Sequence, residues 1–166
     1  MSFHLKPISS ESIPAAIEKV HRYRNLNEPA EAESICLDIL DAEPHHKEAL
    51  VLLLLARTDQ IDDGMNPSRA REVLIKLAGD YDQAYYAGLI YERTAKAIIK
   101  QGRPGSRYAA YEHLRMAMEH YERAESMRPA GNDDAILRYN TCVRLLSHHE
   151  DLQPRPVETF EAVMNE

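Results

Sequence analysis

Apolar residues recur at helical spacing along the chain, in segments separated by short polar stretches that contain Pro, Gly or Asn. Val, Ile and Thr never alternate with polar residues as in a half-buried strand, whereas Ala, Leu, Glu, Arg and Tyr recur every three or four positions. We therefore predict an all-α fold, built of antiparallel hairpins because the connections are short. The predicted helices span 12–26, 28–43, 46–61, 67–79, 82–101, 106–128 and 132–149.

Start and stop signals support these helix boundaries. Asn66 precedes Pro67, which can occupy the first helical turn without losing an amide hydrogen bond. We expect Asn27 to play a similar part before Glu28–Pro29. Asn132 is followed by two aspartates, whose negative charges suit a helix N-terminus. Helix ends are predicted at Pro44, Gly79, Gly102–Gly105 and Pro129.

Three of the predicted helices share one spacing of residues, with steps of four, three and five positions. The series are Ala117, Tyr121, Ala124 and Pro129; Ala32, Cys36, Ile39 and Pro44; and Ala70, Leu74, Leu77 and Asp82. Each series lies in the second helix of a hairpin and ends where the chain must reverse. Small residues let two helices approach closely, so we expect Gly88 and Ala117 to form a close helix–helix contact.

This pattern resembles the tetratricopeptide repeat (TPR) family, whose second helix carries Ala, an aromatic residue, Ala and Pro. Ala87–Gly88 with Tyr91 matches the first half of the motif, and residues 117–129 match the second half. Leu53–Leu54 replaces the usual Leu-Gly pair in the second repeat, and the first repeat lacks it. Repeat ends lie 38 and 47 residues apart instead of about 34, so loops or helices are longer than usual.

The resemblance implies a short α-solenoid over residues 12–149, formed by three repeats and a C-terminal capping helix over 132–149. Residues 1–11 are then a flexible N-terminal segment, and residues 150–166 form a tail. The first helices of such a stack line a concave groove that binds a peptide or protein segment. The implied function is that of a protein-binding adaptor or scaffold.

The helix registers predict which side chains line this groove. The expected residues are Ile17, His21, Arg24, Val51, Leu55, Thr58, Tyr85, Leu89, Arg93, Asn140, Thr141 and Arg144. For the aliphatic members, Val51, Leu55 and Leu89, burial in the core is an equal alternative. Some TPR proteins clamp a C-terminal carboxylate with Lys, Asn and Arg. The corresponding positions here are Ile17, His21, Leu52, Tyr85 and Leu89, which argues against a chaperone C-terminus as ligand.

Residues 93–115 carry a charge of +5, although the whole chain has a net charge of −7. One interpretation is a solvated helix end. The alternative is a basic patch of Lys96, Lys100, Arg103 and Arg107 that docks an acidic protein segment or, more weakly, an RNA phosphate chain. The overall negative charge argues against a dedicated nucleic-acid binder. A third alternative is a self-assembling structural module, for example a homodimer.

Tyr108 and Tyr111 bear on the same choice. They could stack on nucleic-acid bases, but their spacing also fits a core stripe with Ala110, Leu114 and Met118, which we favour.

No pattern in the chain predicts catalysis, a metal or a cofactor. His45–His46 and His148–His149 are adjacent pairs that point apart on a helix, and His113 and His120 are seven residues apart. The chain has no HExxH, CxxC, GxSxG or glycine-rich phosphate motif. Cys36 falls on a packing face, which favours a buried structural thiol over a nucleophile. We therefore expect a protein that is not an enzyme.

The cysteine count and the length of the apolar runs bear on where the protein is located. Two cysteines are too few for a disulfide framework, so we expect a reducing, cytoplasmic setting. The longest apolar run is Ala49–Ala56, which is too short to span a membrane, so we expect no membrane partner.

Pro154 and Pro156 disfavour a continued helix in the C-terminal tail. Beyond them, residues 157–164 have amphipathic spacing. They form either a frayed terminus, a helix docked on the last helix, or an occupant of a groove.

Overall fold

The computed structural model describes residues 2–156, which contain helices and no strand. The elements are η1 (Ser10–Ser12), α1 (Ile13–Asn25), α2 (Pro29–Ala42), α3 (Lys47–Asp59), η2 (Ile61–Asp63), α4 (Ser68–Leu74), α5 (Asp80–Gln101), α6 (Ser106–Ser126) and α7 (Asp134–His148). The all-α prediction is confirmed for this part of the chain. The amphipathic stretch predicted at 157–164 lies outside the described residues.

Helix α4 is shorter than predicted, because it ends at Leu74 and not at residue 79. The side-chain amide of Gln83 donates hydrogen bonds to the carbonyls of Leu74 and Leu77, at 2.7 and 2.6 Å, and the Leu74 carbonyl also accepts from the amide of Leu77 at 3.0 Å. Gly79 has a φ of +96° and immediately precedes α5. The glycine therefore begins the next helix rather than ending α4.

Asparagine residues act at two of the three predicted helix starts. The Oδ1 atoms of Asn66 and Asn132 accept hydrogen bonds from the amides of Ser68 and Asp134, at 2.9 and 3.0 Å. Asn27 differs from the prediction. It adopts a left-handed conformation with φ of +57°, so it reverses the chain between α1 and α2 through its backbone.

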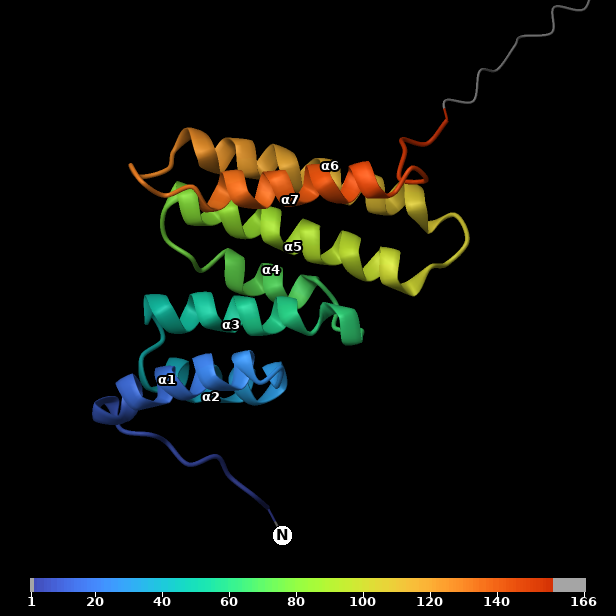
Figure 1. Ribbon diagram of the computed structural model, residues 1–166. Coiled ribbons are helices and arrows are strands. Elements are labelled where there is room, and N and C mark those ends of the chain that lie inside the picture. The colour runs from blue at the N-terminus through green and yellow to red at the C-terminus, as the bar shows by residue number, and fades with distance from the viewer. Residues whose placement is uncertain (1, 157–166) are drawn as a thin grey trace, which may run out of the picture.

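Each helix packs against the next one in the sequence, from α1 and α2 through to α6 and α7. The chain runs back and forth, with α1 and α2 at one end of the molecule and α6 and α7 at the other (Figure 1). The pair α5 and α6 has the most extensive contact. In addition, α1 contacts α3, α3 contacts α5, and α5 contacts α7.

The core consists of two hydrophobic clusters. The first is formed by α1 to α4 together with Ile90 of α5, and the second by α5, α6 and α7 together with Leu152. The positions of the repeated spacing lie inside these clusters. Ala32, Cys36 and Ile39 are buried in the first, and Ala117, Tyr121 and Ala124 in the second. The spacing thus marks packing positions.

Gly88 lies where α5 meets the aromatic ring of Tyr121 on α6. A Cβ atom on Gly88 would be only 2.7 Å from Cε1 of Tyr121. The nearest atoms to this missing methyl group thus belong to Tyr121, one turn beyond the predicted partner Ala117. Close approach of the two helices depends on the absence of a side chain at residue 88.

Candidate functional site

Helices α1, α3, α5 and α7 form one face of the molecule, and they follow one another across it in Figure 1. Ion pairs join neighbouring helices on this first-helix face. Asp59 of α3 contacts Arg24 of α1 at 2.8 Å and Arg93 of α5 at 3.5 Å. His21 contacts Glu48 at 3.3 Å, and Lys47 contacts Asp82 at 3.2 Å. Helices α1, α3 and α5 are thus linked by polar contacts as well as by packing.

A small polar cavity of about 320 Å³ lies beside Asp59. Arg24, Arg93 and Asp62 are among its lining residues. The Nε atom of Arg93 is buried and has no hydrogen-bond partner among residues 2–156. The structure therefore brings together two predicted groove residues, Arg24 and Arg93, through a shared carboxylate that sequence reasoning did not single out.

The other predicted groove residues differ in exposure. Leu89 is only 1% exposed, and Ile17 and Thr58 are also buried, so these three side chains belong to the interior. Val51, Leu55, Tyr85, Asn140 and Thr141 are half-buried, whereas His21 and Arg144 are exposed. Residues available to a ligand are therefore spread over α1, α3, α5 and α7.

Helix α7 presents an exposed stripe that the sequence only partly revealed. Asn140, Thr141 and Arg144 were predicted to face a ligand. Leu137, one turn earlier on the same side, is 62% exposed. A single exposed leucine is common on protein surfaces, so Leu137 adds an apolar contact to this stripe but does not by itself mark an interaction surface. The sequence signal was available, because Leu137 lies three residues before Asn140 and therefore on the same face of the helix.

Acidic residues neutralise most of the basic segment 93–115. Lys96 contacts Glu92 at 2.5 Å, Lys100 contacts Asp62 at 3.4 Å, and Arg107 contacts Asp151 at 2.9 Å. Arg93 contacts Asp59, and Arg115 contacts Glu112 and Glu119. Within residues 2–156, Arg103 makes no such ion pair. Most of the partner acids lie outside the segment, so the sequence count overstated its free positive charge.

The predicted core stripe of this segment is found only in part. Tyr108 and Tyr111 are half-buried, while Ala110 and Leu114 beside them are fully buried in the second cluster. Met118 also packs against this cluster, so the core stripe is confirmed for Ala110, Leu114 and Met118. Tyr108 and Tyr111 are not among the residues of this cluster, and their part in the stripe stays a prediction.

Glu92 of α5 is a buried carboxylate with 0% exposure. The hydroxyl of Tyr121 donates to Oε2 at 2.6 Å, and Lys96 and Arg138 approach Oε1 at 2.5 and 3.3 Å. Burial, followed by the charge of Glu92, raises the pKa of Tyr121, so the phenol remains a proton donor. This network connects α5, α6 and α7 and gives the buried charge its partners.

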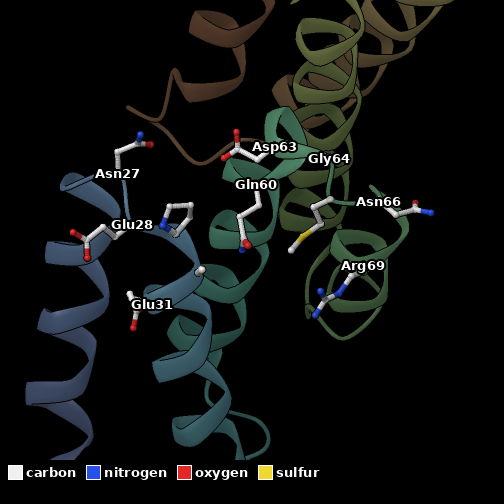
Figure 2. A pocket seen from close by; sticks show the side chains of 11 residues that line it. Asn27, Glu28, Glu31, Gln60, Asp63, Gly64, Asn66 and Arg69 are labelled. Atoms are coloured by element: carbon white, nitrogen blue, oxygen red, sulfur yellow. The ribbon is translucent and has the colours of Figure 1, made fainter. Parts of the chain in front are cut away.

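A cavity of about 720 Å³ lies between the α1–α2 turn and the connection from α3 to α4 (Figure 2). We call it the loop-end cavity. Its lining residues are Asn27, Glu28, Pro29, Ala30, Glu31, Gln60, Asp63, Gly64, Met65, Asn66 and Arg69. Sequence reasoning missed it because two loops, distant in sequence, create it where they meet.

Both thiols are buried, and two of the histidines pack against an aromatic ring. Burial raises the pKa of both Cys36 and Cys142 to about 12, which keeps them protonated at neutral pH and confirms the predicted buried thiol at Cys36. The rings of His113 and His120 lie 5.8 and 5.4 Å from the ring of Tyr91. Residues 2–156 contain no group of three or more His, Cys, Asp or Glu that could hold a metal ion.

None of the helices within residues 2–156 is both long enough and apolar enough to cross a membrane. Comparison with family models, curated proteins and solved structures gives no match to this chain.

Proposed function

We propose that this chain is a TPR-like adaptor that binds a segment of another polypeptide along the first-helix face. The observation that supports the proposal is the series of contacts from α1 to α3, α3 to α5 and α5 to α7. In the described residues, α2, α4 and α6 do not contact one another to the same degree. Closer spacing on one side of a helical stack curves it, so the first helices would form the concave surface.

The exposed chemistry of the face suggests the type of ligand. On α7, Leu137 would contact an apolar side chain of an extended segment. Arg144 would bind an acidic side chain, because the guanidinium group of arginine can form two hydrogen bonds with a carboxylate. Arg24 on α1 and Arg93 on α5 would also attract acidic side chains, although Asp59, which pairs with both, reduces their positive charge. The proposed partner is therefore a protein or peptide with acidic and apolar residues, and the proposed role needs neither catalysis nor a cofactor.

Site-specific photocrosslinking tests this proposal. A photoreactive phenylalanine analogue replaces Asn140 on α7 in one variant and Glu122 on α6 in the control, since both positions are accessible to solvent. In cytoplasmic extract we expect discrete crosslinked proteins only from position 140, reduced when Arg144→Glu is added. Equal crosslinking from both positions, or none from position 140, would contradict the proposed binding face.

A further inference from the structure

The loop-end cavity has a rim of carboxylates without ion-pair partners among residues 2–156. These are Glu28, Glu31 and Asp63, and all three are exposed. Nearby acids are in a different situation, because Asp59 pairs with two arginines and Asp62 with Lys100. In Figure 2, Glu28 and Glu31 project outward from the wall formed by the start of α2, and Asp63 lies on the opposite side of the cavity, so the three carboxylates stand at its rim and not inside it.

Arg69, the one cation that lines the cavity, does not offset this charge. Its Nη2 atom donates to the buried carboxylate of Glu33 at 2.9 Å. Arg57 also donates to Glu33, at 3.0 Å, and lies 3.6 Å from Glu72. These two arginines and two glutamates balance one another, so the three rim carboxylates leave the cavity with a net negative charge.

The walls are held in place by interactions within the chain. The side-chain amide of Gln60 donates to Glu33 at 2.8 Å, and the amide of Met65 donates to the carbonyl of Gln60 at 3.1 Å. Asn27 and Gly64 turn the two loops in left-handed conformations, with φ of +57° and +96°. The cavity therefore exists before a ligand binds, which lowers the entropic cost of binding.

The lining is also partly apolar, through Pro29, Ala30 and Met65. Its volume of about 720 Å³ is within the range of ligand sites. A side chain with an aliphatic stem and a cationic head suits such a surface, because the stem covers apolar atoms while the head reaches the carboxylates.

We propose that the loop-end cavity is a docking site for an arginine or lysine side chain of a partner polypeptide. It lies at the ends of the helices and involves none of the residues invoked on α7, so this inference does not rest on the proposed binding at the first-helix face.

The test uses a short acetylated and amidated peptide with one central arginine, and an otherwise identical peptide with neutral citrulline. Titration into the ¹⁵N-labelled full chain at low salt should shift amide signals of residues 27–31 and 60–69. The citrulline peptide should bind at least about tenfold more weakly, because it lacks the charge.

Matched variants separate the cavity from general attraction to an acidic protein. The variant Glu31→Gln/Asp63→Asn should reduce arginine-peptide affinity about tenfold, whereas Glu18→Gln/Glu122→Gln, with the same charge change elsewhere, should leave it unchanged. Thermal unfolding checks that both variants are folded.

Three outcomes would overturn the proposal. They are signal shifts outside both loops, equal loss of affinity in the two double variants, and a dimer in light scattering that Glu31→Gln/Asp63→Asn dissociates. The last result would assign the cavity to a second copy of this chain.

Discussion

At the scale of single residues, the contact between α5 and α6 depends on three side chains at one place. Gly88 leaves the space, the ring of Tyr121 fills it, and the phenol hydroxyl reaches the buried carboxylate of Glu92 at 2.6 Å. Packing and hydrogen bonding therefore both constrain Tyr121. Separate substitutions can measure how much each contributes to the free energy of unfolding.

Gly88→Ala tests the packing. Inside a helix this change normally stabilises a protein by about 0.5–1 kcal/mol. Here the new methyl group would lie 2.7 Å from the ring of Tyr121, so we expect a loss of about 1–3 kcal/mol in the free energy of unfolding. Urea denaturation measures it, and a gain in stability would show that the ring can move aside freely.

Tyr121→Phe tests the hydrogen bond while keeping the ring. The substitution removes a donor from the buried carboxylate of Glu92, so we expect unfolding to become easier by about 1–3 kcal/mol. Tyr111→Phe is the control, because the Tyr111 hydroxyl makes no hydrogen bond within the described part of the chain. Equal effects of the two changes would argue against a specific role for the Tyr121 hydroxyl.

His120 predicts a pH dependence of stability. Burial lowers its pKa, and the charge of Arg123 lowers it further. The folded protein therefore binds a proton less readily than the unfolded chain, whose histidine pKa is about 6.5. Stability should be unaffected above that value and should fall as the pH decreases through the window below it.

The midpoint of thermal unfolding, measured from pH 7.5 to 5, checks this expectation. His120→Gln should depend less on pH than the parent chain, while the exposed His148→Gln control should behave like the parent. Parallel curves for all three proteins would exclude His120 as the source of the pH dependence.

At the scale of secondary-structure elements, the end of the described chain packs back onto the helices. Leu152 follows α7, yet it is only 5% exposed and belongs to the second hydrophobic cluster. Asp151 beside it contacts Arg107 at 2.9 Å, near the start of α6. Residues 150–152, which we assigned to the tail beyond the boundary at residue 149, are thus part of the folded unit.

Leu152→Ala should lower the free energy of unfolding by about 2–5 kcal/mol, because it removes a buried leucine from a packed cluster. The exposed neighbour in Gln153→Ala provides the control and should have little effect. Chemical denaturation followed by circular dichroism compares the two. Similar stabilities would mean that Leu152 contributes little to the cluster.

Local spacing was enough to predict the helices, because periodicity and capping residues act within a few positions of one another. The early end of α4 was not predictable in this way, since it involves Gln83 of the following helix. The candidate sites were even less accessible. The contacts of Asp59 with Arg24 and Arg93, and the walls of the loop-end cavity, join segments that are distant in sequence.

At the scale of the whole molecule, two clusters share helix α5. Ile90 packs into the first cluster, whereas Ala84 and Ala95 pack into the second. Contacts otherwise run mainly between neighbouring helices, so the two ends of the molecule can respond differently to damage.

Leu54→Ala, placed in the first cluster, tests this division. Amide hydrogen exchange should accelerate in α1 to α4 more than in α6 and α7, because the cavity it creates lies far from the second cluster. The reciprocal change Leu114→Ala should have the opposite distribution. Uniform acceleration along the chain in both variants would indicate a single cooperative unit.

The small buried side chains of helix α5 also limit how much sequence change it can tolerate. Four of its buried positions are Ala84, Gly88, Ala95 and Ala97, which are occupied by the smallest side chains. Every substitution there except alanine to glycine adds volume against packed helices. In a library of all single variants, these four positions would therefore accept few alternatives, whereas the exposed surfaces of α2 and α6 would accept many.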